Sequence, residues 1–254
     1  ISNVPQYLVF YEGNPVPKKC NSQKGQRGPV ERGAMAATHG TPTGDLNARG
    51  VTTSGDVYWN QDAAALIELA VSRKEGVFSA HRALVTETGE RTGRSPNDKF
   101  IVDEATTTED INWGDVNVST DLATFTKMRA KVVEYLSAQD TLFVQDLYCG
   151  ADFSEALPIR VINQNAWHNA FARNMFIRPD AERLASHSPE FTVMHAPHFE
   201  ADAEQDGLNS QCFVIVNYQA KEVIIGGTRY AGEIKKSIFS VMNLILPKKG
   251  ILPM

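Results

Sequence analysis

The chain has 254 residues, of which 42% are hydrophobic and 22% charged, so it can bury one sizeable core and has no bias toward disorder or fibrous structure. A formal net charge of −5 offers no positive field for a phosphodiester backbone or an anionic membrane surface. No apolar run approaches the roughly 18 residues that span a bilayer, and the three cysteines are widely spaced, with no CxxC pair. We therefore expect a globular cytoplasmic protein without a nucleic-acid or membrane partner.

The first segment, residues 1–46, is rich in Gly, Pro, Asn, Lys and Gln and has little apolar periodicity. This composition predicts a leader of low order rather than a packed element. Its one apolar patch, residues 7–11, leaves open a second interpretation, in which the patch adds an edge strand to a sheet.

From residue 57 onward helical and strand patterns alternate. Residues 62–73 have helical apolar spacing, and residues 77–86 read as one strand. Ser119 is the expected N-cap of a helix that runs to about Ala138.

The second half of the chain continues this alternation. We expect strands at 141–147, 158–162, 191–195, 212–216 and 223–225, a helix at 166–176, and a last helix at 231–246 that Pro247 stops. Because some strands are joined by hairpin-length links and others by helices, the pattern predicts an α/β domain with a mixed β-sheet flanked by helices.

The first motif that carries chemistry is a turn with three cationic side chains, Arg91-Thr92-Gly93-Arg94-Ser95-Pro96-Asn97-Asp98-Lys99-Phe100. A guanidinium donates two parallel hydrogen bonds to a carboxylate, and a neighbouring glycine lets a ligand approach the backbone. The turn is a candidate anion site, although a solvated hairpin turn has the same composition.

The second motif joins a buried strand to a helix, Gly226-Gly227-Thr228-Arg229-Tyr230-Ala231-Gly232-Glu233-Ile234-Lys235-Lys236. Anions collect at a helix N-terminus because its N–H groups are free and its dipole end is positive. Adjacent lysines raise the cost of charging one another, which favours a neutral amine able to bind a metal. A solvated lysine pair is the alternative.

Gly227 and Gly232 have the spacing of the glycines in a phosphate-binding P-loop, but Glu233 stands where that loop needs lysine. No GxxxxGK[ST] occurs elsewhere in the 254 residues. The main cradle for a nucleoside triphosphate is therefore expected outside them.

Taken together, the two motifs resemble the ATP-type phosphoenolpyruvate carboxykinases. The resemblance extends from about Asn47 to Met254 and includes these further segments: Tyr58-Trp59-Asn60, Cys149-Gly150-Ala151, Asn174-Met175-Phe176-Ile177-Arg178-Pro179 and Gly207-Leu208-Asn209-Ser210. It implies that residues 47–254 form the substrate-binding N-terminal lobe of a two-lobed enzyme of gluconeogenesis, which converts oxaloacetate and ATP to phosphoenolpyruvate, CO2 and ADP with Mg2+ and Mn2+.

The resemblance also implies roles for four residues. Arg94 is expected to hold the substrate carboxylate and the departing CO2, and Tyr230 to orient the substrate. Lys236 is expected to bind the catalytic metal and to approach the ATP phosphate, while Lys235 contacts the phosphoryl group.

Some family features are not found in this sequence. The P-loop, the metal-binding histidine and the metal-binding aspartate are missing, and residues 1–46 match no part of the family's pattern. We therefore expect a nucleotide-binding lobe that is absent from this chain, and a chain that is inactive alone. The alternative is a non-catalytic anion-sensing or interaction domain that keeps Arg94 and Tyr230.

His187, His195, His198 and Cys212 are residue types that can bind zinc. Pro197 breaks the helical register between the two later histidines, and Cys212 falls in a predicted buried strand. We therefore expect these residues to be structural.

Overall fold

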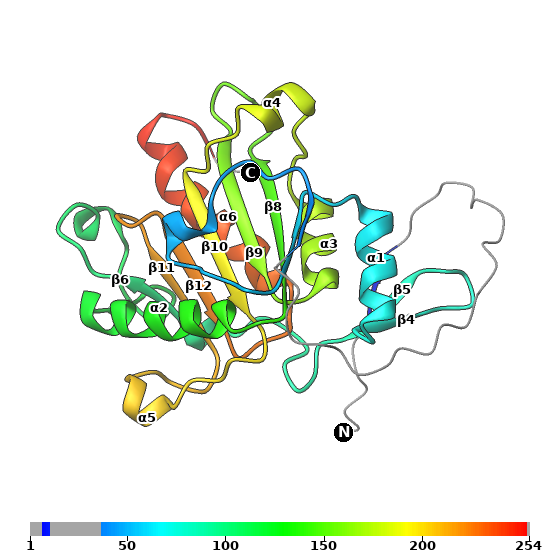
Figure 1. Cartoon of the computed structure of the whole chain (residues 1–254). Coiled ribbons are helices and arrows are strands. Elements are labelled where there is room, and N and C mark those ends of the chain that lie inside the picture. The colour runs from blue at the N-terminus through cyan, green and yellow to red at the C-terminus, as the bar shows by residue number, and fades with distance from the viewer. Residues whose placement is uncertain (1–6, 11–36, 253–254) are drawn as a thin grey trace, which may run out of the picture.

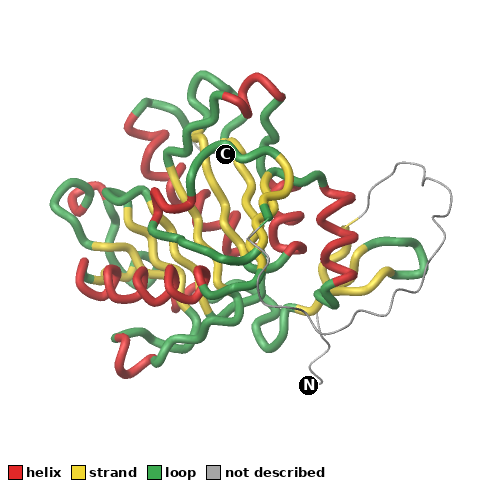
Figure 2. Tube along the Cα trace, viewed as in Figure 1, coloured by secondary structure: helices red, strands yellow, loops and turns green. Residues whose placement is uncertain are grey.

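The computed structural model describes residues 7–10 and 37–252. Within them, nine strands form one large sheet, and three more form a small antiparallel sheet with the order β1-β5-β4. Figures 1 and 2 show the small sheet to one side of the large one. In spatial order the strands of the large sheet are β2 (Thr38–Gly40), β3 (Asp56–Trp59), β8 (Thr141–Cys149), β9 (Leu157–Asn163), β10 (Phe191–Ala196), β12 (Glu222–Gly226), β11 (Phe213–Asn217), β6 (Lys99–Val102) and β7 (Val118–Thr120).

Neighbouring strands of the large sheet are parallel except for the pairs β8–β9 and β11–β12, which are antiparallel. The predicted mixed sheet flanked by helices is therefore confirmed. The remaining elements are β1 (Tyr7–Phe10), β4 (Gly76–Phe78), β5 (Leu84–Glu87), α1 (Ala63–Ser72), α2 (Leu122–Ser137), α3 (Ala166–Met175), α4 (Ala181–Ala185), α5 (Ala203–Asp206), α6 (Gly232–Lys248) and the short 3-10 helices Leu46–Arg49, Pro96–Asp98 and Thr108–Asp110.

Helices cover both faces of the large sheet, α2 on one and α6 on the other (Figure 1). Along β10, Met194 packs in the cluster with α2 while Val193 packs in the cluster with α6, and on β12 Ile224 and Ile225 alternate in the same way. Strands buried on both faces need apolar residues at every position, which explains the continuous apolar runs in the sequence.

A third apolar cluster connects α1 and α3 to the small sheet. It includes Leu66 of α1, Trp167 and Phe171 of α3, and Leu84 of β5. The cluster also includes Phe143 of β8, so it attaches the small sheet to the large one.

Three details differ from the sequence predictions. Residues 77–86 form two strands, β4 and β5, because the polar residues between them make a turn in which Arg82 has a φ of 63°. The N-cap of α2 is Asp121, whose carboxylate accepts the Thr124 N–H at 2.7 Å, while Ser119 lies in β7. Pro247 lies inside the last turn of α6, where its missing N–H removes a single helical hydrogen bond.

The proposed leader, residues 1–46, falls largely outside the described residues. Tyr7–Phe10 pairs with β5 as an edge strand, and Thr38–Gly40 pairs with β3. Leu46, the last residue of the proposed leader, is buried against the α2 side of the sheet. The boundary at residue 46 stays a prediction.

Two buried carboxylates, Asp146 and Glu222, tie different segments together through ion pairs. Asp146 on β8 faces Arg160 on β9, with Arg160 Nε 2.7 Å from the carboxylate, and both side chains are at most 5% exposed. At the start of β12, the Glu222 carboxylate accepts hydrogen bonds from Arg49 at 3.2 Å and from Arg129 of α2 at 2.9 Å. These pairs connect the N-terminal stretch, the sheet and α2.

No helix among the described residues is long and apolar enough to cross a membrane.

Candidate active site

The loop between β12 and α6 carries much of the second motif. Gly227 has a φ of 65°, and a Cβ there would lie 2.3 Å from the Gln211 carbonyl oxygen. Only glycine combines this left-handed conformation with such a close backbone contact. The strand can therefore turn sharply before α6 begins at Gly232.

The first turns of α6 place two lysines differently. Lys235 is exposed, whereas Lys236 is half-buried, with its Nζ 4.1 Å from the centre of the Phe239 ring. A cation over an aromatic face is attracted by the ring quadrupole. Phe239 therefore helps to hold the Lys236 ammonium group in place.

The turn that contains Arg94 is fastened to α6 by a buried carboxylate. The Ser95 backbone N–H donates to Glu233 Oε1 at 2.7 Å, and Glu233 is 4% exposed. This bond brings the two sequence motifs into contact.

Arg91, in the same turn, is engaged within the protein. It pairs with Asp98 at 3.5 Å and donates to Ser210 Oγ at 3.1 Å. By contrast, no hydrogen bond or ion pair joins the exposed Arg94 guanidinium to another residue in the described part of the chain. Arg94 is thus available to an anion.

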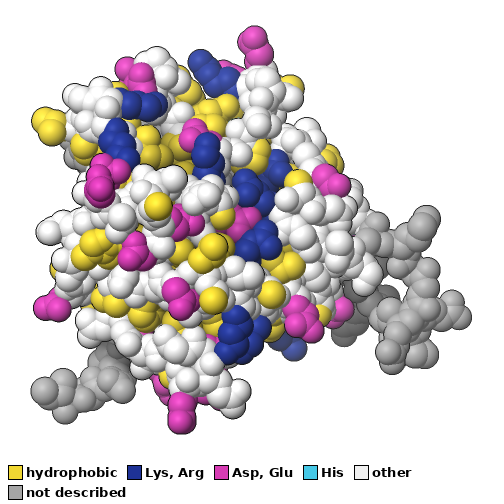
Figure 3. Space-filling view, turned by 90° about the vertical axis from the view of Figure 1, so that its left-hand side faces the viewer, with side chains coloured by type: hydrophobic (Ala, Val, Ile, Leu, Met, Phe, Trp, Pro, Cys, Tyr) yellow, Lys and Arg dark blue, Asp and Glu magenta, His cyan; other side chains and the backbone are white. Residues whose placement is uncertain are grey.

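Arg94, Lys99 and Lys236 line one cavity of about 380 Å³. Lys99 is the first residue of β6, and its Nζ donates to Asn117 Oδ1 at 3.1 Å. The one carboxylate in the lining, Asp110, is paired with Lys248. Figure 3 shows several Lys and Arg side chains together near the middle of the face that lies at the left of Figure 1.

The electrostatics of this cationic cavity follow from its crowding. Burial lowers the pKa of Lys99, and the nearby charges of Arg94 and Lys236 lower it further. Burial raises the pKa of Glu233, while the Ser95 N–H opposes that rise. A dianion that enters the cavity would relieve the repulsion among the three cations.

The four predicted site residues are only partly brought together. Arg94 and Lys236 share the cationic cavity, whereas Tyr230 and Lys235 do not line it. The Tyr230 ring lies against Gly232, where a Cβ would be 2.4 Å from Tyr230 Cε1.

Sequence reasoning assigned no role to Lys99 and Glu233, although both stood in the two motifs. In the sequence, each is a charged residue at the margin of an apolar run. Such residues are common on protein surfaces, so this pattern does not indicate a functional site. Glu233 is buried and Lys99 is half-buried, and both features depend on tertiary structure.

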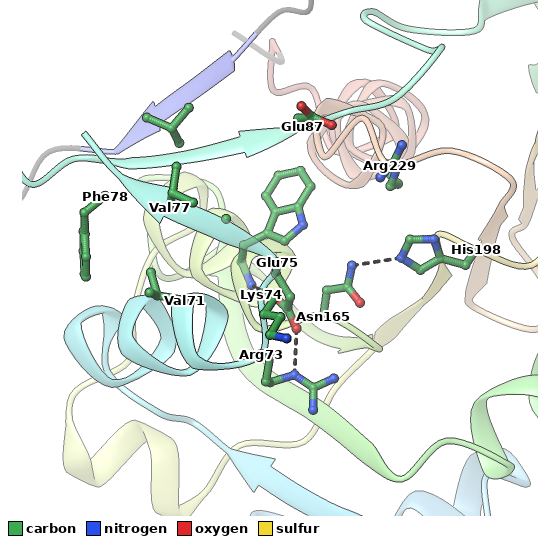
Figure 4. A pocket seen from close by; sticks show the side chains of 13 residues that line it. Val71, Arg73, Lys74, Glu75, Val77, Phe78, Glu87, Asn165, His198 and Arg229 are labelled. Atoms are coloured by element: carbon green, nitrogen blue, oxygen red, sulfur yellow. Dashed lines mark hydrogen bonds and ion pairs between the residues drawn. The ribbon is translucent and has the colours of Figure 1, made fainter. Parts of the chain in front are cut away.

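A larger cavity, of about 760 Å³, lies elsewhere, between the β4 hairpin and the residues around His198. In Figure 4 Asn165 points toward His198, and Arg229 lies on the same side, away from Phe78. None of the four predicted site residues lines this cavity.

A metal site requires more donors than this cavity offers. Across residues 7–10 and 37–252 no group of three or more His, Cys, Asp and Glu side chains could hold a metal ion. Lys236 is the single predicted metal ligand, so the described residues do not by themselves fit a divalent cation.

Comparison with known proteins matches residues 55–254 to the family model for phosphoenolpyruvate carboxykinase. The chain belongs to the phosphoenolpyruvate carboxykinase family. A protein of Brevibacillus brevis named phosphoenolpyruvate carboxykinase (ATP) is 52% identical over 198 residues, which are 78% of this chain and 38% of that protein. A Bacillus subtilis protein of the same name is 47% identical over 212 residues, covering 84% of this chain and 40% of the relative.

A third relative, phosphoenolpyruvate carboxykinase (ATP) 1 of Moorella thermoacetica, is 46% identical over 220 residues, covering 87% of this chain and 41% of the relative. The chain thus spans about two fifths of the length of these curated relatives. Membership in the carboxykinase family confirms the resemblance found in the sequence.

Proposed function

We propose that the protein, in its full natural length, is an ATP-dependent phosphoenolpyruvate carboxykinase that converts oxaloacetate and ATP to phosphoenolpyruvate, CO2 and ADP in the cytoplasm. This chain supplies the oxaloacetate-binding half. The observation that carries the proposal is the convergence of Arg94, Lys99 and Lys236 on one cavity. Family membership favours this enzyme over a non-catalytic anion sensor.

The cavity suits the charge changes of such a reaction. Oxaloacetate has two carboxylates, and loss of CO2 leaves an enolate whose negative charge needs stabilisation. Fixed cations aimed at a developing charge lower the barrier, because they need not reorganise during the reaction. Arg94 would bind a carboxylate through two parallel hydrogen bonds, and Lys99 and Lys236 would stabilise the enolate.

Tyr230 and Lys235 complete the proposed site from the same loop and helix. Tyr230 would orient the substrate with its ring and hydroxyl, and the exposed Lys235 would contact the transferred phosphoryl group. Neither residue lines the cationic cavity, so we assign both to its rim.

The cofactors are ATP, Mg2+ and Mn2+. Divalent ions neutralise phosphate oxygens and stabilise an enolate when bound. Lys236 would give one ligand to such an ion, and the roles assigned above belong to this chain's own side chains.

The deciding experiment is a coupled assay of phosphoenolpyruvate formation from oxaloacetate and ATP with Mn2+, run on the full-length protein and on the variant Arg94→Ala. We expect the wild type to turn over and Arg94→Ala to raise the KM for oxaloacetate at least about tenfold, since a charged hydrogen-bond pair is lost. The KM for ATP should change little. Arg183→Ala, on exposed α4, is the matched control.

No turnover by a folded full-length protein would contradict the enzymatic proposal and favour the anion-binding alternative. An equal rise of both KM values in Arg94→Ala would contradict the role of Arg94 in holding oxaloacetate.

A further inference from the structure

The loop that carries Tyr230 contains two consecutive carbonyl groups outside any strand or helix. Thr228 and Arg229 follow the end of β12 at Gly226 and precede α6. Thr228 is 2% exposed, so its polar backbone needs partners inside the protein. Those partners come from two other elements.

Each carbonyl faces one imidazole. His195 of β10 has its Nε2 2.9 Å from the Thr228 oxygen, and His168 of α3 has its Nε2 2.9 Å from the Arg229 oxygen. Both histidines are fully buried, with their ring centres 4.5 Å apart in an edge-to-face arrangement. A strand and a helix thus hold adjacent peptide groups of one loop.

The carbonyls also determine which nitrogen of each ring carries the proton. An oxygen can only accept, so Nε2 of each ring must be the N–H donor. The Nδ1 atoms of His168 and His195 are buried without a hydrogen-bond partner, which suits an aprotic nitrogen better than a second N–H. The other tautomer would set a lone pair against each oxygen and leave a buried donor unpaired.

The held segment leads directly to Tyr230. The Tyr230 N–H donates to Thr228 Oγ1 at 3.1 Å, so the position of Thr228 sets the position of the Tyr230 backbone. On its far side, the Tyr230 ring packs on Gly232. Tyr230 therefore sits between a residue fixed by His195 and the first residue of α6.

We propose that His168 and His195 are positioning residues for the enzyme reaction: by donating from Nε2 to the Arg229 and Thr228 carbonyls, they hold Tyr230 in the orientation that binds oxaloacetate. This rests on the proposed function, and specifically on Tyr230 contacting the substrate. Neither imidazole touches substrate in this scheme.

The test compares His195→Leu, His195→Gln, His168→Leu and His168→Gln in the full-length protein. Leucine fills similar space without a donor, whereas the glutamine side-chain amide can place an N–H near the Nε2 position. We expect each leucine variant to raise the KM for oxaloacetate about tenfold with little change in the KM for ATP, and each glutamine variant to recover most of that loss. His81→Leu, at an exposed position, is the control.

A double-mutant cycle separates positioning from general stability. If the histidines act through Tyr230, His195→Leu should have little further effect on the KM for oxaloacetate in a Tyr230→Ala background. Additive effects would overturn the proposal, as would an unchanged KM in a folded leucine variant. If the leucine variants do not fold, nitrogen NMR of histidine-labelled wild type decides: a proton on Nδ1 of either ring overturns the proposal.

The wild-type assay distinguishes failure of the positioning role from failure of the proposed carboxykinase activity. An inactive wild type refutes the proposed carboxykinase activity. An active wild type with additive or absent effects of the histidine changes refutes only the positioning role.

Discussion

Glu233 influences the cationic cavity in two opposing ways. Its carboxylate fixes the Arg94 turn by accepting the Ser95 N–H at 2.7 Å, and its negative charge partly neutralises Arg94 and Lys99. The first effect prepares the site for an anion, while the second weakens the field that attracts one. Substitutions that separate hydrogen bonding from charge can resolve the two.

We predict that Glu233→Ala in the full-length protein raises the KM for oxaloacetate about tenfold, because the Ser95 N–H loses its acceptor and the turn loosens. Glu233→Gln keeps an acceptor oxygen and removes the charge, so its KM should stay within about threefold of the wild type. Steady-state kinetics measure both, with the exposed Glu204→Ala as control. A KM in Glu233→Gln as high as in Glu233→Ala would show that charge, and not the hydrogen bond, matters.

A second residue-scale prediction concerns pH. Burial lowers the pKa of His195 from its ordinary value of 6.5 to about 4. Between these two values the unfolded chain binds a proton that the folded chain does not, so stability falls as pH decreases through this window. From pH 7 to pH 5 this amounts to about 2 kcal/mol.

His195→Gln lacks the titrating group. Between pH 7 and pH 5 its free energy of unfolding should therefore fall by about 2 kcal/mol less than that of the wild type. Urea unfolding at both pH values measures the difference, since the other titrating groups, including His168, His187 and His198, are common to both proteins. Parallel losses in the two proteins would mean that His195 is accessible to protons when folded.

At the scale of elements, the antiparallel pair β8–β9 depends on the buried Asp146–Arg160 contact. We predict that Asp146→Ala lowers the free energy of unfolding by about 3–5 kcal/mol, because it leaves the Arg160 charge buried without its partner. Glu190→Ala, which breaks the exposed pair with Lys221, should cost less than about 1 kcal/mol. Denaturant unfolding compares the two, and equal costs would contradict the importance of burial.

Elements with strong apolar periodicity were predictable, and those set by short polar contacts were not. The patterns of α1, α3 and β8 to β12 came from burial on one or both faces, which repeats along the sequence. The β4–β5 turn and the Asp121 cap depend on single polar residues among several similar candidates, such as Ser119.

The candidate site shows the same division. Arg94 and Lys236 were named from motifs in this one chain, and the structure places both on the cationic cavity. The Ser95–Glu233 hydrogen bond joins segments that are distant in sequence, and Lys99 shares the cavity with the distant Lys236. No local sequence pattern predicts such contacts. Of the histidine pair, only His195 is singled out by the sequence, as one of the residues of a possible zinc site, and His168 is not. Nothing in the sequence shows that each ring faces a backbone carbonyl.

At the scale of the whole molecule, residues 37–54, which precede the family match, pack against the matched region. Leu46 is buried in the α2 cluster, and Arg49 bonds Glu222 at the start of β12. Leu46 and Arg49 lie outside residues 55–254, where the family model matches, but their partners lie inside that range. Stability of the matched region should therefore depend on them.

Leu46→Ala is predicted to lower the free energy of unfolding by about 2–3 kcal/mol through lost burial and the cavity it leaves. Leu122→Ala, where the leucine is 55% exposed, should cost less than about 1 kcal/mol. Thermal or denaturant unfolding tests this, and indifference to Leu46→Ala would place residues 37–54 outside the cooperative unit.

Gly232, the first residue of α6, sets a limit on how this protein can evolve. Alanine within a helix is favoured over glycine by up to about 1 kcal/mol, so heat selection should repeatedly sample that exchange. Here the added methyl group would occupy space taken by the Tyr230 ring, 2.4 Å away. If Tyr230 binds oxaloacetate, Gly232→Ala would displace its ring and is not open to adaptation at higher temperature. Thermophilic descendants would have to gain stability at other positions.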